Sequence, residues 1–88
     1  MSYYLDFSDQ AKNDISFHKK SGNKAVLKKL QVLLNELLEQ PFEGTGKPEP
    51  LKHSLTGSWS RRINLEHRLV YEVVDNTVFI YSAKGHYN

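Results

Sequence analysis

The side chains of this sequence that could do chemistry are a carboxylate, an arginine and a histidine from three separate segments. Glu49 lies between two prolines, Arg68 follows a histidine in mid-chain, and His86 lies near the end of the sequence. A base, a cationic donor and an acid are the groups that cleave RNA through its own 2′-hydroxyl without a metal. Such cleavage is the candidate chemistry, provided that the fold brings the three side chains together.

Each of these residues, taken singly, also has a simpler explanation. A glutamate between prolines is ordinarily a solvated loop residue, and an arginine on an exposed strand ordinarily forms a surface ion pair. A histidine near a chain end is ordinarily idle, and His18 fits a helix face. The histidines lack the spacing of a metal site, and the sequence has neither a glycine-rich phosphate loop nor a nucleophile elbow. We therefore expect no metal and no cofactor.

Length and composition indicate the number of domains and the cellular compartment. The 88 residues predict a single domain, residues 1–88, with one modest core. The absence of cysteine excludes disulfides and thiolate metal sites, and it suits a reducing compartment. The first residues do not resemble a signal peptide, and no apolar run is long enough to cross a membrane. We expect a cytoplasmic protein with no membrane partner.

The net charge of +2 arises entirely in the second half of the sequence. Residues 45–88 carry three lysines and three arginines against four acids, whereas the first half is balanced. All three arginines, Arg61, Arg62 and Arg68, belong to the second half. The planar arginine fork can make two parallel hydrogen bonds to a phosphate. Composition alone nevertheless favours a simpler interpretation, in which these charges form a solubilising surface.

The first half predicts a strand and two helices. Residues 3–7 are rich in aromatic side chains and suit a strand. Ser8 is a suitable N-cap for a helix that Gly22 ends, and Asn23 can cap a second helix that ends before Pro41. The apolar stripe expected on the second helix comprises Val26, Leu30, Leu33, Leu34, Leu37 and Leu38.

The second half predicts a loop followed by a meander of strands. Three prolines and two glycines in residues 41–50 indicate the loop. Beyond it we expect a short strand at residues 51–55 and strands at 58–64, 67–74 and 78–83, with turns at 65–66 and 75–76. The predicted fold class is α+β, with a two-helix hairpin packed on one face of a twisted antiparallel sheet. Strand periodicity permits Arg62 and Arg68 to share a face, and the register between their strands decides which face that is.

Four segments of this sequence are similar to the YoeB/Txe family of bacterial toxins. They are PFEGTGKPEPLKH at 41–53, LTGSWSRRI at 55–63, EHRLVY at 66–71 and HY at 86–87. The resemblance is dense in the second half and rests on helix layout in the first. The family belongs to the RelE/ParE-like superfamily of type II toxin–antitoxin systems. Its fold has two helices on an antiparallel sheet, in agreement with the pattern of this sequence.

The resemblance implies an endoribonuclease that cleaves messenger RNA in the ribosomal A site and thereby inhibits translation. By the same resemblance, Glu49 is the general base, Arg68 stabilises the phosphate, and His86 is the general acid. The resemblance also places Lys52, Glu66 and Tyr87 in family motifs. We expect these three residues, together with Arg62, to bind substrate. It implies a cognate antitoxin of the YefM/Phd type, the ribosome and messenger RNA as partners, and it admits a homodimer.

The end of the sequence departs from the family pattern. Where relatives often have an arginine and a bulky residue, this sequence has Lys84 and Gly85, and Asn88 follows the tyrosine. Gly85 predicts a more mobile tail, so that His86 would be ordered by the ribosome or by RNA. Two other functions remain open, namely a ParE-like toxin that binds DNA gyrase without nuclease activity and a plain RNA-binding module. Neither of them would need Glu49, Arg68 and His86 together.

Overall fold

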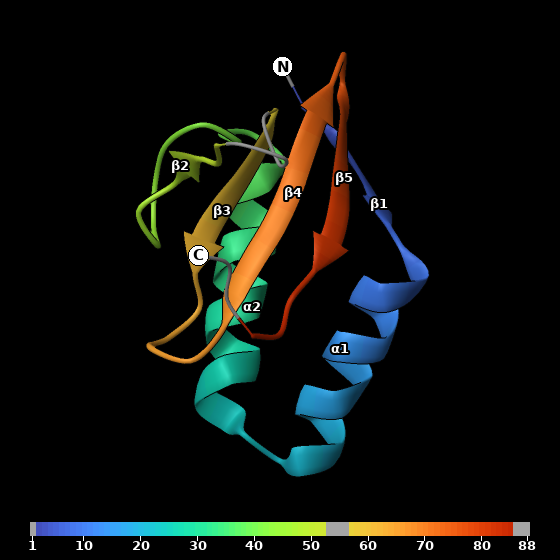
Figure 1. Cartoon of the computed structure of the whole chain (residues 1–88), viewed down its shortest axis with the longest axis vertical. Coiled ribbons are helices and arrows are strands. Elements are labelled where there is room, and N and C mark those ends of the chain that lie inside the picture. Colours follow the sequence, from blue (N-terminus) through green and yellow to red (C-terminus); the bar gives the residue numbers. More distant parts are fainter. Residues whose placement is uncertain (1, 53–56, 86–88) are drawn as a thin grey trace.

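One strand and two helices precede a run of four strands. The computed structural model describes residues 2–52 and 57–85. The elements are β1 (Tyr4–Phe7), α1 (Asp9–Ser21), α2 (Lys24–Leu37), β2 (Glu49–Pro50), β3 (Ser58–Arg62), β4 (Arg68–Val74) and β5 (Thr77–Ser82) (Figure 1). Neither α1 nor α2 is long and apolar enough to cross a membrane.

The five strands form one sheet in the order β1-β5-β4-β3-β2. Strands β2 to β5 pair antiparallel with their neighbours, whereas β1 pairs parallel with β5. The predicted fold class is confirmed, with the refinement that the sheet is mixed. The chain leaves β1 through both helices and returns to the far edge of the sheet, so β1 meets β5 without a hairpin.

The predicted helix boundaries are confirmed by their caps. The Ser8 hydroxyl accepts a hydrogen bond from the backbone N–H of Ala11 at 3.0 Å, which satisfies a free donor of the first turn of α1. Gly22 ends α1 in the left-handed conformation, with φ 69°. The side-chain oxygen of Asn23 accepts from the N–H of Val26 at 3.2 Å and starts α2.

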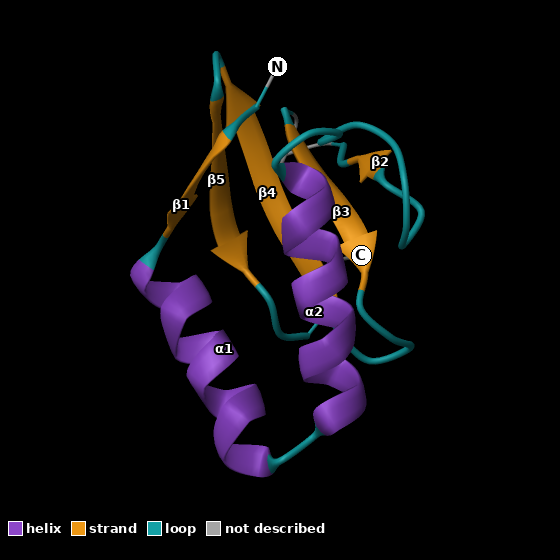
Figure 2. Cartoon of the chain, turned by 180° about the vertical axis from the view of Figure 1, so that it is seen from behind, coloured by secondary structure: helices purple, strands orange, loops and turns teal. Residues whose placement is uncertain are grey.

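The core lies between the helices and one face of the sheet. Figure 2 shows α2 lying across that face, with α1 beside it. The buried side of α2 carries Val26, Leu30, Leu33 and Leu37. The sheet contributes Leu69, Tyr71, Val78 and Ile80, each 0% exposed. Burial of this alternating set explains why the strand register is strongly fixed, since a slip of one residue would turn every core side chain outward.

Two predicted strand boundaries are wrong. The short strand expected at 51–55 lies earlier, at Glu49–Pro50, and residues 53–56 lie outside the described residues. The turn expected at 65–66 is a longer connection between Arg62 and Arg68. Its cause is Asn64, whose side-chain oxygen accepts from the N–H groups of Glu66 and His67 at 2.8 and 2.7 Å and replaces bonds of the strand ladder.

Candidate functional site

The pairing of β3 with β4 determines which charged side chains share a face. Arg62 lies opposite Arg68, and Arg61 lies opposite Leu69. Leu69 is buried in the core, so Arg61 points inward while Arg62 and Arg68 point away from the helices. Strand β2 adds Glu49 to the same outer face through its pairing with β3. The predicted sharing of one face by Arg62 and Arg68 is therefore confirmed.

Glu49 and Arg68 form an ion pair on this outer face. Arg68 Nη1 lies 3.4 Å from Glu49 Oε1, and the two side chains are 23% and 56% exposed. An exposed pair of this kind contributes little to stability, because water competes for both charges. A phosphate could therefore replace the carboxylate at Arg68 at small cost, which would leave Glu49 free to accept a proton.

The other predicted site residues are distributed around this pair. Arg62 and Lys52 are exposed. Glu66 belongs to the connection between β3 and β4. Its side chain is 81% exposed, and its Oε1 lies 3.9 Å from Nε2 of His67. The predicted acid, His86, and the predicted stacking residue, Tyr87, lie outside the described residues.

Arg61 has a structural environment, in contrast with its neighbour Arg62. It is 0% exposed. Its Nε donates to the Tyr71 hydroxyl at 3.1 Å, and its Nη1 donates to Oε1 of Glu36 at 2.9 Å. Its terminal nitrogens also donate to the backbone carbonyls of Gln40, Glu43 and Thr45. Arg61 therefore binds the loop that follows α2 and is not available to a phosphate.

The groups around Arg61 have shifted pKa values. Burial acts to raise the pKa of Glu36, but hydrogen bonds from the hydroxyl and N–H of Thr45 and from Arg61 outweigh it, so this pKa lies below its ordinary value. Burial raises the pKa of the Tyr71 hydroxyl, although Arg61 opposes that effect. A charged Glu36 and a neutral Tyr71 are the forms that this network requires.

This network determines where the chain re-enters the sheet at Glu49. The Tyr71 hydroxyl donates to the carbonyl of Pro41 at 2.7 Å, at the start of the loop. At its end, the N–H of Arg62 donates to the carbonyl of Gly46 at 2.7 Å. Gly46 has φ 85°, and a Cβ there would lie 2.9 Å from the Arg62 carbonyl oxygen, so glycine is required for this close approach. The loop therefore has a fixed path three residues before Glu49.

The last described residues approach the same ion pair. The backbone N–H of Arg68 donates to the carbonyl of Gly85 at 2.7 Å, and the N–H of Gly85 donates to Nδ1 of His67 at 3.0 Å. Gly85 has φ 75°, a conformation that side-chain-bearing residues adopt rarely. Hydrogen bonds hold both backbone groups of Gly85. The tail whose mobility was predicted, residues 86–88, lies outside the described residues.

A hydrogen bond between Tyr81 and Glu72 lies further along the outer face. The Tyr81 hydroxyl donates to Oε1 of Glu72 at 2.6 Å. This hydrogen bond, together with burial and the charge of Glu72, raises the pKa of Tyr81. Tyr81 therefore stays neutral and donates a hydrogen bond to Glu72 rather than acting as a base.

The sequence argument missed the buried polar residues of α1. Asp14 and His18 are 3% and 1% exposed, and both contact the backbone of Ala83. The available signal was their spacing, because residues four apart lie on one face of a helix, and this face also carries Ala11. Across residues 2–52 and 57–85, no group of three histidine, aspartate or glutamate side chains is arranged to hold a metal ion.

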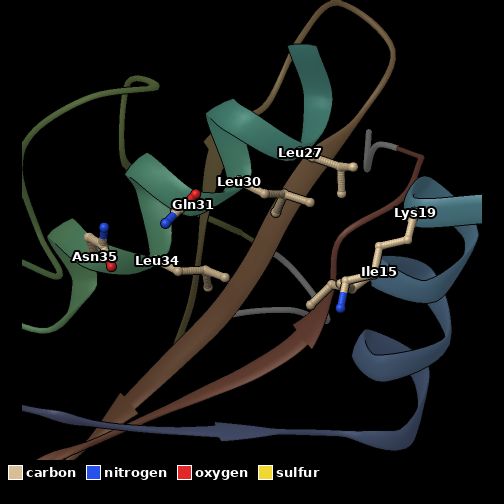
Figure 3. A pocket seen from close by; sticks show the side chains of 7 residues that line it. All are labelled: Ile15, Lys19, Leu27, Leu30, Gln31, Leu34 and Asn35. Atoms are coloured by element: carbon tan, nitrogen blue, oxygen red, sulfur yellow. The ribbon is translucent and has the colours of Figure 1, made fainter. Parts of the chain in front are cut away.

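A separate hollow lies on the helix side of the molecule. Its volume is about 400 Å³ and its lining is mostly apolar. Figure 3 shows the residues that line it, which are Ile15 and Lys19 from α1 and Leu27, Leu30, Gln31, Leu34 and Asn35 from α2. Glu49 and Arg68 are on the opposite face of the sheet, so this hollow is not part of the candidate site.

Comparison with known proteins gives a consistent result. Residues 7–87 match the family model described as the YoeB-like toxin of bacterial type II toxin–antitoxin systems. Toxin YoeB of Escherichia coli K12 is 45% identical over 83 residues, which are 94% of this chain and 98% of the relative.

Solved structures agree over nearly the whole chain. The YoeB dimer from Staphylococcus aureus has a TM-score of 0.85 and 45% identity, and the match covers 99% of this chain and 100% of that one. The YoeB–YefM complex from the same organism has a TM-score of 0.83 and 46% identity, with the same coverage. The match of the family model and the identity to these relatives show that the chain belongs to the family of YoeB-like toxins of bacterial type II toxin–antitoxin systems.

Proposed function

We propose that this toxin is a metal-independent endoribonuclease that cleaves messenger RNA in the ribosomal A site of the bacterial cytoplasm. The observation that carries the proposal is the Glu49–Arg68 pair on the outer face, next to Arg62. The hydrogen bond from Arg68 to Gly85 brings the chain to this pair one residue before His86. A base and two cationic side chains thus share the outer face, and the third catalytic group follows directly in sequence.

In the proposed reaction Glu49 takes the proton of the 2′-hydroxyl. The 2′-oxygen then attacks phosphorus, and Arg68 stabilises the negative charge of the phosphorane. The bond to the 5′-oxygen breaks with its electron pair, and His86 protonates that oxygen. The products are a 2′,3′-cyclic phosphate and a 5′-hydroxyl. Histidine suits the acid because its ordinary pKa is close to neutral.

The remaining residues of the proposed site bind substrate. Lys52 and Arg62 are exposed cations that would hold the flanking phosphates. Tyr87 would stack on a base, and Glu66 would contact the RNA from the β3–β4 connection. A basic binding face also suits an acidic antitoxin segment that folds on binding, and we propose a YefM-type antitoxin as the cellular inhibitor. Self-association is part of the proposal, because a relative forms a dimer.

The test is primer extension on a defined messenger RNA, with and without programmed ribosomes. Glu49→Gln and His86→Ala should each lower the cleavage rate by about 10²–10⁴ while far-UV circular dichroism and the melting temperature stay unchanged. Glu39→Gln is the matched control, because it neutralises an exposed carboxylate away from the outer face. Full activity of Glu49→Gln would refute the assignment of the base. No cleavage by the unaltered toxin in either condition would refute the nuclease and direct attention to gyrase.

A further inference from the structure

The short segment that follows β5 is held by side chains from two distant parts of the chain. Residues 83–85 lead from the end of β5 to Arg68. Ala83 is 0% exposed, and both of its backbone polar groups are bonded to side chains of α1. Gly85 is bonded through both of its backbone groups to His67 and Arg68. Four directed hydrogen bonds therefore hold three residues.

Two of these hydrogen bonds come from one face of α1. Asp14 Oδ2 accepts from the N–H of Ala83 at 2.9 Å, and Oδ1 of the same carboxyl accepts from Nε2 of Gln10 at 2.7 Å. His18 Nε2 lies 2.8 Å from the carbonyl oxygen of Ala83. Because a carbonyl can only accept, this nitrogen carries a hydrogen and donates it. The opposite polarity of the two partners fixes the orientation of the peptide groups on either side of Ala83.

His67 provides the third side chain of this arrangement. Its Nδ1 accepts from the N–H of Gly85 at 3.0 Å, so this nitrogen carries no hydrogen. The ring packs edge to face against the ring of His18, with centroids 4.8 Å apart. The contact between the two rings therefore connects the hydrogen bonds at Ala83, made by α1, with those at Gly85, made beside the start of β4.

Asp14 and His18 lose their hydration on burial, and they satisfy the N–H and the carbonyl of Ala83, which would otherwise be buried without partners. These hydrogen bonds have a consequence besides stability. What hydrogen bonds add over apolar packing is a defined position and direction for the bonded backbone. The residue that benefits is the next one in the chain, because consecutive Cα atoms are only about 3.8 Å apart.

We infer that Asp14, His18 and His67 are positioning residues that aim the end of the chain, and hence His86, at the Glu49–Arg68 pair. This inference rests on the proposed role of His86 as the general acid. A displacement of a reacting group by about 1 Å can cost about 10²-fold in rate. Loss of the bond from Gly85 should therefore lower kcat and leave KM, which depends on the exposed cations, nearly unchanged.

The test uses two variants at one position. His67→Phe keeps an aromatic ring against His18 but removes the acceptor for the N–H of Gly85. His67→Asn puts an amide oxygen near the place of Nδ1 and restores an acceptor. Val26→Ala, in the core on α2, is the control for a loss of stability, because Val26 is 2% exposed and makes no hydrogen bond to residues 83–85.

Two readouts separate the inference from the proposed function. Amide hydrogen exchange at Ala83 and Gly85, followed by NMR on the free toxin, reports the hydrogen bonds without any substrate. Cleavage on programmed ribosomes, at a temperature where all variants are folded, gives kcat and KM. For His67→Phe we expect faster exchange at Gly85, a fall in kcat of about 10–100-fold and an unchanged KM. We expect His67→Asn to restore most of the protection of the Gly85 amide and most of kcat.

Each contrary outcome has a distinct meaning. Unchanged kcat in His67→Phe despite faster exchange at Gly85 would overturn the positioning role. An equal loss of kcat in Val26→Ala, at an equal loss of melting temperature, would reduce the three residues to a contribution to stability. Rapid hydrogen exchange of the Gly85 amide in the unaltered toxin would refute the hydrogen bond to His67, whatever the activity. Protected Gly85 without any cleavage would refute the proposed function and with it the catalytic reason for the arrangement.

Discussion

Replacing each of two adjacent arginines should separate stability from activity. Arg61 is 0% exposed and binds the loop after α2, whereas Arg62 is exposed beside Arg68. Arg61→Met keeps most of the buried volume but removes the charge and every donor. Arg62→Met makes the same chemical change one residue later, on the outer face, and is its matched control.

The magnitude follows from the partners that Arg61 would leave behind. Without it, the Glu36 carboxylate and the carbonyls of Gln40 and Glu43 lose a charged donor. Removing one member of a fully buried ion pair costs about 3–5 kcal/mol, and because the Glu36 side chain is 27% exposed we expect the lower end, about 3 kcal/mol. That is a large part of the roughly 5–15 kcal/mol that stabilises a small domain. For a chain of this length each kcal/mol shifts the melting temperature by about 4–8 °C.

Arg61→Lys provides a milder change in case the methionine variant does not fold. Lysine keeps a positive charge near Glu36 but lacks the planar fork that reaches Tyr71 and the loop carbonyls together. We expect a loss of about 1.5–3 kcal/mol, the contribution of one hydrogen bond to a charged group.

The assay is urea unfolding followed by far-UV circular dichroism, with cleavage measured on the same preparations. Arg62→Met should change the free energy of unfolding by no more than about 0.5 kcal/mol and should weaken cleavage. The reasoning fails if Arg61→Met is as stable as the unaltered protein, or if the two methionine variants lose equal stability. Either result would mean that the hydrogen bonds of Arg61 are not what holds the loop.

Three further predictions concern Arg68, Glu36 and Gly46. Arg68→Lys should keep the charge but lower kcat by about 10²–10³, because a point charge replaces the fork at the phosphate; an unchanged kcat would exclude that role. The pKa of Glu36 lies below its ordinary value of 4.5, so its stabilising effect is complete above that value and is lost as the pH falls through the lower pKa of the folded state. Acid titration of the unfolding free energy should therefore be less steep in Glu36→Gln, and an identical slope would contradict the shift. Gly46→Ala should destabilise the fold by about 1–3 kcal/mol, measured by urea unfolding, because φ is 85° and the added Cβ meets the Arg62 carbonyl at 2.9 Å.

The helices could be predicted from the sequence because their signals are local. Ser8, Gly22 and Asn23 act on backbone groups within three residues of themselves, so residue type and position suffice. The parallel pairing of β1 with β5 could not be predicted in this way. It depends on the path of the two intervening helices, which no residue of β1 encodes.

The candidate site shows the same division between local and distant information. Alternation along each strand permitted Arg62 and Arg68 to share one face, and the register of β3 with β4 puts them there. It also put Arg61 on the other face, yet the core position of Arg61 depends on acceptors from α2 and the following loop. The contacts of Asp14 and His18 with Ala83 likewise join residues far apart in sequence. Such contacts become visible only when the fold is known.

The pairing of β1 with β5 also constrains when the toxin can fold during its own synthesis. Tyr4 donates its N–H to Asn76, and Ser8 donates to Ile80, at 2.8 and 2.9 Å. The first strand therefore has no ladder partner until the last strand exists, and α1 gains its contacts to Ala83 later still. Such pairings between the two ends of a chain form slowly, because a long loop must close first. The complete sheet can therefore form only after β5 has been synthesised, and the hydrogen bonds of Ala83 and Gly85 beside the proposed site form after it.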